Sequence, residues 1–519
     1  MQTEVLIVQL AARFNHKPPA AWFIKAYCAE KGLLVDVLEA NINAPLPEVV
    51  DAVVFKKPRI VGVSCYIWNI ELAQKLALDI KKLLPETVIV FGGPEVSFAE
   101  ETDYKMADYI VQGEGEARSY LLYQAILSGN PPKERLQKSV HVPLCEIPNF
   151  LTESYFASVD EKLMPHMLVY YESSRGCPFS CGYCLSAAGH GLEHLPIERV
   201  KEDVQLLVRH GAKCIKFTDR TFNSDKKRAA ELLKFFGSLD TDAVFHMEVA
   251  PDLIDDSFLD VLKTLPPGRV QIEAGIQSVK DETLAAVTRK QNTKKALEQI
   301  KKVSDIGNCH IHTDLIVGLP GDSLSDIVEG VNACVATGAH MVQLGFLKML
   351  HGSPLRAKAK EMGLIFSDYP PYEILQTPLL SYETIRKLDK IAHVIDRVLG
   401  TGQFSHIMSY GTEVFGAPFS FFEAIAEHPL PAGQKAIYTL LYDILRQKGT
   451  EEKAAHVVKL DCLTHDPKAQ LPDGIPPLWD KEKEREHKKT GQTVRAAFFP
   501  YDGQTRVFIH KNLKGEQKK

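Results

Sequence analysis

Three cysteines stand close together in the stretch ESSRGCPFSCGYCLSAAG, residues 172–189. Cys177, Cys181 and Cys184 fall within eight positions, and nothing else in the sequence groups thiols in this way. A structural zinc site takes four protein ligands, and His190 could be the fourth. A cubane iron–sulfur cluster also takes thiolates, and three protein ligands leave one of its irons open to chelate a small molecule. The spacing favours such a cluster over zinc or a chance grouping.

An open barrel is predicted to position this loop. Six Val- and Ile-rich runs alternate with helical patterns between residues 167 and 350. Six parallel units are fewer than the eight that close a TIM barrel, so we expect a partial (β/α)6 barrel. The first strand leads directly into the cysteines, which places them at the carboxyl ends of the strands, where such folds keep their chemistry. The predicted strands lie near 167–173, 213–219, 243–249, 269–275, 309–317 and 341–349.

Residues 1–140 form a second alternating series. Five short apolar runs separated by helical segments predict a doubly wound parallel sheet of the flavodoxin-like, Rossmann-type class. Ligands bind such sheets beyond the carboxyl ends of the strands, here SCYIWN, GGPEVS and GEGE among others. The sequence GEGE is not G-x-G-x-x-G and does not follow the first strand, so the dinucleotide fingerprint is absent.

The rest of the chain divides into a connector and a C-terminal region. Residues 141–166 are Pro-rich and irregular, and they precede the barrel, which we assign to 167–365. Residues 366–519 are predicted to be mainly helical, with a final hairpin around YDGQ. The charged run DKEKEREHKKT is most simply a solvated helix or loop.

Composition indicates a multidomain protein of a reducing compartment. A chain of 519 residues is too long for one hydrophobic core. Its net charge of −5 gives no reason to propose nucleic acid or an anionic membrane as a partner. No apolar run approaches the roughly 20 residues of a membrane span, and no signal peptide is evident at the N-terminus. Ten mostly scattered cysteines do not make a disulfide framework, so we expect a cytoplasmic location.

The motif C-x3-C-x2-C after the first strand of a partial barrel resembles the radical S-adenosylmethionine superfamily. In that superfamily the open iron of a 4Fe–4S cluster chelates S-adenosylmethionine, and one electron yields a 5′-deoxyadenosyl radical. The resemblance implies an external electron donor of the flavodoxin or ferredoxin type. It also implies an aromatic cover from Tyr183, a ribose contact from Glu248, a carboxylate contact from Arg289 and an adenine platform around GLPGD. The implied S-adenosylmethionine residues are Tyr183, Asp219, Arg220, Glu248, Glu273, Gln277, Arg289, Val317 and Gly318.

The N-terminal sheet resembles the cobalamin-binding domain. In that domain a serine and paired glycines at neighbouring strand ends leave room for the nucleotide tail of the cofactor. The Asp-x-His-x-x-Gly loop of that family is missing, because His16 lacks an aspartate two residues before it. We therefore expect either water or no protein ligand below cobalt. The implied cobalamin residues are Ser64, Tyr66, Gly92, Gly93, Pro94, Glu95, Gly113 and Glu114.

With YYESSRGCPFSCGYCLS and FTDRTFN, the chain most resembles the domain-of-unknown-function 4080 family of cobalamin-dependent radical enzymes. This resemblance favours a methyltransferase that acts on an unactivated carbon of a small-molecule or peptide substrate. A cobalamin-assisted rearrangement or cyclisation and a non-catalytic cobalamin or cluster sensor are the alternatives. Methylthio transfer to tRNA is disfavoured, because it needs a second set of three cysteines. The catalytic residue near the substrate cannot be named.

Overall fold

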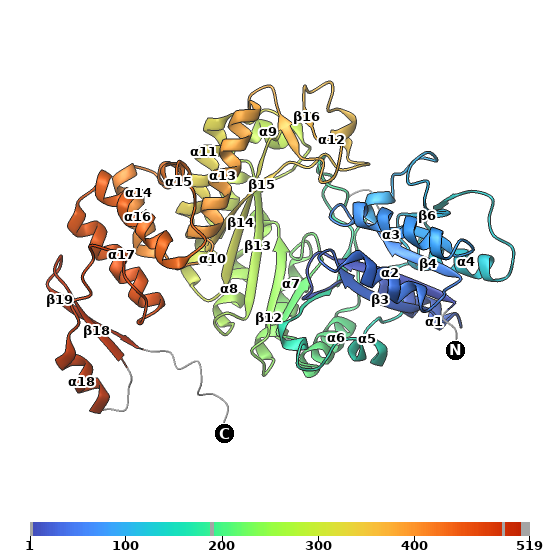
Figure 1. The fold of residues 1–519 in the computed structure, drawn as a ribbon, viewed down its shortest axis with the longest axis horizontal. Helices are drawn as coiled ribbons and strands as arrows, with labels where there is room; N and C mark the ends of the chain where they lie inside the picture. The colour runs from blue at the N-terminus through green and yellow to red at the C-terminus, as the bar shows by residue number, and fades with distance from the viewer. Residues whose placement is uncertain (1–3, 187–190, 490–493, 510–519) are drawn as a thin grey trace. The chain divides into compact units, whose positions relative to one another are not determined.

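The computed structural model describes residues 4–186, 191–489 and 494–509. It divides into two compact units (Figure 1). Unit 1 comprises Met1–Ile311, Gly318–Asp322 and Phe346–Ser381, and unit 2 comprises His312–Val317, Ser323–Gly345 and Tyr382–Lys519. All three motif cysteines and the whole N-terminal sheet belong to unit 1.

The N-terminal sheet has six strands in the order β3-β1-β4-β5-β6-β7, and neighbouring strands are parallel. The strands are β1 (Val5–Ala11), β3 (Asp36–Asn41), β4 (Ile60–Ser64), β5 (Val88–Gly92), β6 (Tyr109–Gln112) and β7 (Leu136–Lys138). The helices are α1 (Ala20–Glu30), α2 (Leu46–Val54), α3 (Ile70–Leu83) and α4 (Glu116–Leu127).

Both faces of this sheet are covered by helices. Leu6 and Val8 of β1 share one hydrophobic core with α2 and α3, whereas Val5 and Ile7 share a second core with α1 and α4. Burial on both faces explains why the strands read as continuous apolar runs, as is usual for parallel sheets. The predicted doubly wound sheet is confirmed.

The barrel sheet of unit 1 has the order β13-β12-β11-β8-β2, again with parallel neighbours. Burial alternates along β13, so that one face is fully buried and the other carries half-buried polar side chains. The strands are β8 (Leu168–Tyr171), β11 (Cys214–Phe217), β12 (Val244–Val249) and β13 (Val270–Gln277); β14 (His310–Val317) and β15 (Met341–Phe346) follow in the chain and are neighbours. The helices between them are α6 (Ile197–Arg209), α7 (Lys226–Ser238), α8 (Asp256–Thr264), α9 (Asp281–Ala286), α10 (Thr293–Ile306) and α11 (Leu324–Ala336).

The two-residue strand β2 (His16–Lys17) was not predicted from the sequence. It belongs to the loop after β1, yet it pairs with β8 and so extends the barrel sheet. The side chain of Lys17 is buried, and its ammonium group contacts Glu39 and Ser158. The contact with Glu39 offsets only part of the desolvation, so burial still lowers the pKa of Lys17, and the ion pair fixes the loop between the two sheets.

Short elements complete unit 1. The connector holds η2 (Leu144–Glu146), α5 (Glu153–Ala157) and η3 (Met164–His166). The remaining elements are η1 (Pro94–Val96), β9 (Ser174–Arg175), β10 (Glu193–His194), η4 (Pro251–Leu253), α12 (Pro354–Ala357), β16 (Ile365–Phe366) and β17 (Ile374–Gln376).

The C-terminal part of unit 2 is mainly helical, as predicted. Its helices are α13 (Tyr382–Val398), α14 (Ser405–Phe415), α15 (Pro418–Ala426), α16 (Gln434–Lys448) and α17 (Glu451–His465). The charged run forms α18 (Lys481–Lys489), and the final hairpin is β18 (Val494–Phe499) with β19 (Gln504–Ile509). Lys459 ties α17 to the hairpin, because its ammonium group donates to the carbonyl of Phe498 at 2.7 Å.

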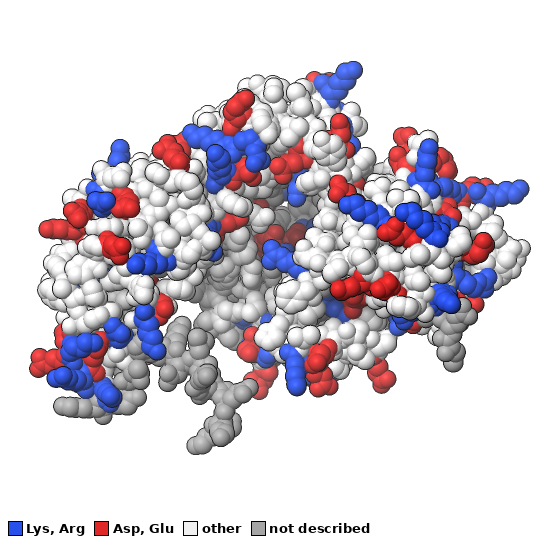
Figure 2. Space-filling view, viewed as in Figure 1, with Lys and Arg blue, Asp and Glu red and all other residues white. Residues whose placement is uncertain are grey.

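The described surface mixes both signs of charge. Lys and Arg alternate with Asp and Glu over the face in Figure 2, with no large area of one sign. Among the described helices, none combines the length and the apolar character needed to cross a membrane.

Candidate functional site

The cysteine loop is braced at its centre by two other segments. The amide of Gly182 donates to the carbonyl of Val287 at 2.8 Å, and its own carbonyl accepts from the amide of Leu355 at 2.8 Å. The hydroxyl of Thr288 donates to the carbonyl of Ser180 at 2.6 Å. Thr288 has φ 53°, a conformation that non-glycine residues seldom adopt without support. The loop is therefore held in shape by hydrogen bonds on both sides.

The three thiols are free and have polar neighbours. Cys181 is buried, whereas Cys177 and Cys184 are half-buried. The Cys177 sulfur lies 3.6 Å from the hydroxyl of Thr221, and the guanidinium of Arg289 lies 3.9 Å from the Cys181 sulfur. Burial raises the pKa of the Cys181 thiol, and the charge of Arg289 opposes that shift.

This donor set fits a cluster with one open iron. Three thiols on one braced loop, beside a guanidinium that stabilises negative charge, are the ligands that iron–sulfur clusters take. Within the described residues, no three His, Cys, Asp or Glu side chains gather closely enough to hold a single metal ion. His190, the candidate fourth ligand of a zinc site, lies outside the described residues.

Arg289 joins the cysteine loop to the end of β13. Its Nη1 donates to the hydroxyl of Tyr183 at 3.1 Å, and its Nη2 donates to the carbonyl of Gly275 at 2.7 Å. The side chain of Gln277 lies over Gly275, where a β-carbon would collide with it. The structure thus brings three of the predicted S-adenosylmethionine residues, Tyr183, Gln277 and Arg289, to one place.

A second group of predicted residues lies just after β11 and within β12 and β13. Arg220 lies 3.9 Å from the carboxylate of Glu248, and Glu248 is in register with Glu273. The Glu273 carboxylate lies 2.9 Å from both Lys216 and His246. Burial alone would raise the pKa of Glu273, but these two partners outweigh it and hold the pKa at about 2. Glu273 is therefore a fixed negative charge on the half-buried face of the sheet.

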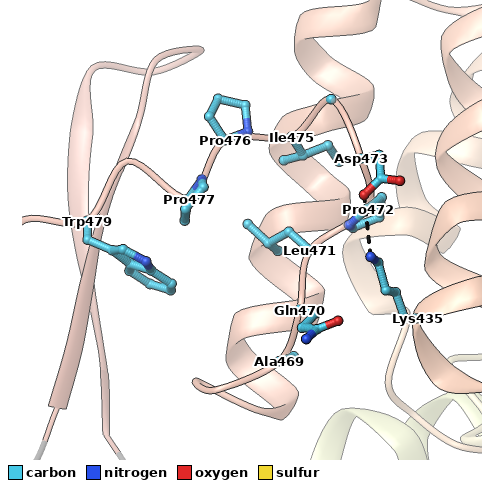
Figure 3. A pocket seen from close by; sticks show the side chains of 11 residues that line it. Lys435, Ala469, Gln470, Leu471, Pro472, Asp473, Ile475, Pro476, Pro477 and Trp479 are labelled. Carbon is cyan, nitrogen blue, oxygen red and sulfur yellow. Dashed lines mark hydrogen bonds and ion pairs between the residues drawn. The ribbon is translucent and has the colours of Figure 1, made fainter.

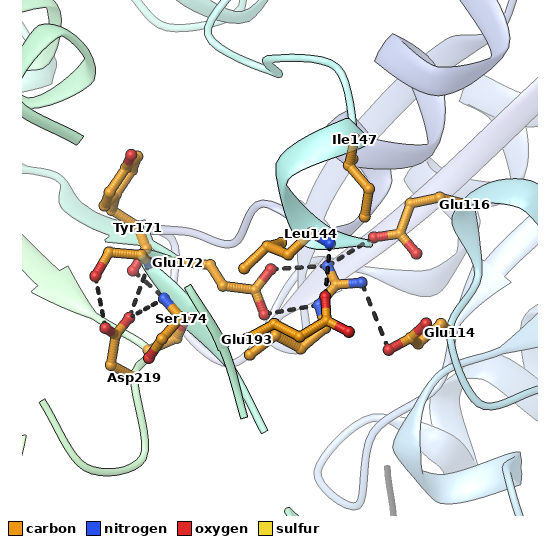
Figure 4. Close-up of polar contacts among 12 residues, drawn as sticks. Glu114, Glu116, Leu144, Ile147, Tyr171, Glu172, Ser174, Glu193 and Asp219 are labelled. Carbon is orange, nitrogen blue, oxygen red and sulfur yellow. Dashed lines mark hydrogen bonds and ion pairs between the residues drawn. The ribbon is translucent and has the colours of Figure 1, made fainter. Parts of the chain in front are cut away.

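Asp219 has its hydrogen-bonding capacity filled by the protein. It is 2% exposed, and its carboxylate accepts from the amides of Ser173 and Ser174 at 2.8 and 3.0 Å and from the Ser173 hydroxyl at 2.6 Å (Figure 4). The structure gives Asp219 the task of bracing the chain before the cysteines. A direct contact with S-adenosylmethionine stays a prediction.

The predicted adenine platform contacts a later segment. Gly318 has φ 92°, and a β-carbon there would lie 2.6 Å from the Ile374 side chain. The preceding residue, Val317, ends β14 and is buried. A side chain at position 318 would displace Ile374, so the glycine is required by packing as well as by backbone geometry.

The predicted cobalamin edge is built from small residues at strand ends. Ser64 and Gly92 end the paired strands β4 and β5 and lie opposite each other. Gly93 has φ 117°, and a β-carbon there would lie 2.5 Å from the carbonyl oxygen of Cys65. Gly113 has φ 81°, with Ser139 Oγ 2.9 Å from the position of a β-carbon. Both clashes are with protein atoms, so these glycines are required where the strand ends pack on their neighbours. The small residues at this edge also fit a cofactor tail that runs close to the backbone.

The remaining predicted cobalamin residues have protein neighbours. Tyr66 stacks on Trp68 with ring centroids 4.4 Å apart, and Pro94 begins η1. Glu95 is 6% exposed and accepts hydrogen bonds from Tyr372 and, at 3.5 Å, from Tyr104. Glu95 therefore faces protein, and its contact with cobalamin stays a prediction.

Sequence reasoning missed an ionic network that links the two sheets. Arg175 lies two residues before Cys177, and its guanidinium contacts Glu116 at 2.7 Å and Glu172 at 2.8 Å (Figure 4). A longer contact of 3.9 Å joins it to Glu114. The sequence showed only an arginine in ESSRGC and two glutamates in GEGE, and no sequence pattern indicated that these residues contact each other.

His141 extends this network into the connector. Its ring nitrogens lie 3.2 Å from Glu114 and 3.0 Å from Glu193. Glu193 also accepts from the amide of Leu144 at 2.7 Å. Glu114 is thus held by His141 and, at 3.9 Å, by Arg175 next to Gly113, and its contact with cobalamin also stays a prediction.

His16 lies beside the barrel strand β8. Its Nδ1 is 3.2 Å from the hydroxyl of Tyr170, and burial and the positive charges of Arg13 and Lys216 lower its pKa. The expectation that cobalt receives no protein ligand from His16 stays a prediction.

A separate pocket in unit 2 contains none of the predicted site residues. It has a volume of about 590 Å³ and is formed by Lys435 and the segment 469–479 (Figure 3). Proline and leucine side chains line it, together with Trp479 and the ion pair of Lys435 with Asp473 at 3.4 Å.

Three family models match successive parts of the chain. Residues 5–121 match the B12 binding domain, 171–334 the radical SAM superfamily, and 360–514 the protein of unknown function DUF4080. The chain thus contains regions that match the B12 binding domain, the radical SAM superfamily and DUF4080 in succession, and the resemblance seen in the sequence is confirmed. Its cofactors are a 4Fe–4S cluster, S-adenosylmethionine and cobalamin.

Two curated relatives are methyltransferases. The chain is 25% identical to the cobalamin-dependent radical SAM methyltransferase TokK of Streptomyces tokunonensis, over 61% of this chain and 50% of TokK. It is 23% identical to the 2-(S-pantetheinyl)-carbapenam-3-carboxylate methyltransferase of Streptantibioticus cattleyicolor, over 67% of this chain and 54% of that enzyme. The chain thus spans about half the length of these relatives.

Solved structures share the fold. TsrM from Kitasatospora setae, with cobalamin and a 4Fe–4S cluster bound, has a TM-score of 0.58 and 17% identity over 73% of this chain and 79% of TsrM. The cobalamin-dependent S-adenosylmethionine radical enzyme OxsB, as the apo protein, has a TM-score of 0.62 and 14% identity over 94% of this chain and 82% of OxsB.

Proposed function

We propose that this protein is a radical methyltransferase that acts on an unactivated carbon. The observation that carries the proposal is that both cofactor-binding edges belong to one compact unit and are joined by the Arg175 network. The methyltransferase names of two curated relatives support the same class of reaction.

When bound, the cluster and S-adenosylmethionine supply a radical for hydrogen abstraction, and cobalamin supplies a methyl group. The protein's part is to hold and separate these groups. Cys177, Cys181 and Cys184 would ligate three irons of the cluster. Arg289, already oriented by Tyr183 and Gly275, would pair with the methionine carboxylate.

The cobalamin edge would act by leaving space. Gly92, Gly93 and Gly113 keep side chains away from the ends of three neighbouring strands. A bulky cofactor tail could then lie against the backbone without displacing the sheet. Glu273 would contribute a fixed charge from the barrel, because Lys216 and His246 keep it ionised.

The proposal includes partners and location. A small molecule or peptide is the substrate, and a flavodoxin- or ferredoxin-type protein supplies electrons to the cluster. No nucleic acid or membrane takes part, and the enzyme works in the cytoplasm. The mixed charge of the face in Figure 2 and the net charge of −5 agree with the absence of a polyanionic partner.

The test begins with protein produced anaerobically with iron, sulfide and hydroxocobalamin. About four irons and one cobalt per chain are expected, with a base-off Co(II) electron paramagnetic resonance signal. Reduction with S-adenosylmethionine present should then yield 5′-deoxyadenosine, and methyl transfer should also yield S-adenosylhomocysteine. Formation of 5′-deoxyadenosine alone in the presence of converted substrate would favour rearrangement, and loading without any turnover would favour a sensor.

A further inference from the structure

The segment Phe346–Ser381 of unit 1, here called the strap, contacts all three predicted cofactor regions. It includes α12, β16 and β17 (Figure 1). The Leu355 amide donates to the Gly182 carbonyl in the cysteine loop. Ile374 packs on Gly318 of the predicted adenine platform. Tyr372 donates to Glu95, two residues after Gly93 at the cobalamin edge.

The start of the strap is hydrogen-bonded to the segment around Tyr372. A movement at one of the three contacts would therefore be transmitted to the other two. The Met349 amide donates to the Tyr372 carbonyl at 2.9 Å, and the Ile374 amide donates to the Leu347 carbonyl at 2.9 Å. Arg356, next to Leu355, donates to the Met349 carbonyl and lies 4.7 Å over the ring of Tyr372. A series of contacts thus leads from the cysteine loop through Leu355 and Arg356 to Tyr372, and Tyr372 in turn contacts Glu95 of the N-terminal sheet domain.

The Glu95 end of this path is tightly packed. A β-carbon on Gly352 of the strap would overlap the ring of Phe98, which follows η1. Burial raises the pKa of Glu95, while the hydrogen bonds from Tyr372 and Tyr104 oppose that rise. Both tyrosines have a left-handed backbone, φ 55° for Tyr372 and φ 47° for Tyr104. Such conformations persist where the surrounding structure holds them, and they gather at functional positions.

We propose that Tyr372 is a positioning residue that fixes cobalamin relative to the cluster and S-adenosylmethionine. Its hydroxyl donates to Glu95, which is itself part of the turn η1 immediately after Gly93. The same backbone segment holds the cysteine loop through Leu355 and the adenine platform through Ile374. This inference rests on the proposed function, because only an enzyme that uses both cofactors together needs a constant separation between them.

Tyr372→Phe tests the proposal, because it removes the donated hydrogen bond and keeps the ring under Arg356. Tyr369→Phe is the matched control, since Tyr369 is in the same strap and its side chain is 70% exposed. Both variants are loaded with cobalamin and cluster, and the dipolar coupling between Co(II) and the reduced cluster is measured by pulsed electron paramagnetic resonance. Iron content and circular dichroism establish that each variant is folded.

For the wild-type protein and Tyr369→Phe, one narrow distance distribution is expected. For Tyr372→Phe, the distribution broadens about twofold or shifts, and the dissociation constant of cobalamin rises about tenfold because a hydrogen bond to a buried carboxyl group is lost. Identical distributions in Tyr372→Phe and the wild type would overturn the proposal.

Failure of the proposed function has a different signature. If the chain does not methylate, S-adenosylhomocysteine is absent from the wild-type reaction while the narrow Co–cluster distance is still present. If only the positioning role is wrong, S-adenosylhomocysteine forms and the distance in Tyr372→Phe is unchanged.

Discussion

The cysteine loop and the glycine edge of the N-terminal sheet prepare their sites in opposite ways. The loop offers three thiols, and the guanidinium of Arg289 lies beside one of them; these are the side chains predicted to bind the cluster and S-adenosylmethionine. The edge offers glycines, and β-carbons at Gly93 and Gly113 would meet neighbouring protein atoms within 3 Å, so an added carbon would push the strand ends apart. The cysteine loop, the donor site, should therefore lose its cofactor when a side-chain atom is removed. The glycine edge, the space-making site, should lose its cofactor when an atom is added.

The largest effect is expected from the donor site. Replacing any one of Cys177, Cys181 and Cys184 by Ala should abolish the cluster, because two protein thiolates do not hold a cubane that must keep an open iron. Iron analysis and the loss of reductive S-adenosylmethionine cleavage check this. Cobalamin content should be unchanged.

The exposed Cys145→Ala is the matched control, and it should retain iron and turnover. If the single replacements in the loop left the iron content intact, the claim that these three cysteines ligate the cluster would be wrong.

The next effect is expected from adding one carbon to the space-making site. Gly93→Ala places a methyl group 2.5 Å from the carbonyl of Cys65 in a backbone conformation with φ 117°. Both problems force the end of β5 to move, so cobalamin binding should fall by at least about tenfold while iron stays at the wild-type level. Cobalt content after gel filtration measures the result.

Gly433→Ala controls for the loss of a glycine, since nothing lies within 4 Å of a β-carbon there. Equal cobalamin retention in Gly93→Ala and Gly433→Ala would mean that the glycine edge is a folding feature only.

A third prediction concerns the link between the two sites. Arg175→Met leaves Glu116 and Glu172 next to each other without their cation, and both are mostly buried. Breaking a buried ion pair from one side costs about 3 kcal/mol, so the first thermal transition should fall by several degrees. Arg59→Met, which removes an exposed pair with Glu4, should change the transition by less than about 1 °C. If the two variants were equally stable, the Arg175 network would not be what joins the sheets.

How far the sequence predicts each feature depends on the range of the interaction. The barrel strands were predicted within a few residues, for example 213–219 against Cys214–Phe217, because alternation of burial is local. The cysteine motif was equally local. The strand β2, by contrast, consists of one histidine and one lysine, and only pairing with β8 makes it a strand.

The polar partners of the site were beyond sequence reasoning for the same reason. Arg175 and Glu116 are 59 positions apart, and Glu95 and Tyr372 are 277 positions apart. A strand-end carboxylate such as Asp219 reads as a ligand in the sequence, and only the structure shows that it also accepts three hydrogen bonds from Ser173 and Ser174. Residue type and strand position predict that a polar group is available at an edge, but not which group it meets.

The smallest predicted effect refines the donor site. Tyr183→Phe removes only the hydroxyl that accepts from Arg289 at 3.1 Å, and Arg289 keeps its bond to the Gly275 carbonyl. One neutral acceptor is worth about 1 kcal/mol, so the dissociation constant of S-adenosylmethionine should rise about fivefold, with iron and cobalt contents unchanged. Equilibrium binding to the anaerobic holoenzyme measures the change, and Tyr382→Phe, at an exposed tyrosine of unit 2, is the control. A loss of iron in Tyr183→Phe would show instead that the hydroxyl supports the cluster loop itself. The cluster would then depend on the side chains around the thiols as strongly as on the thiols.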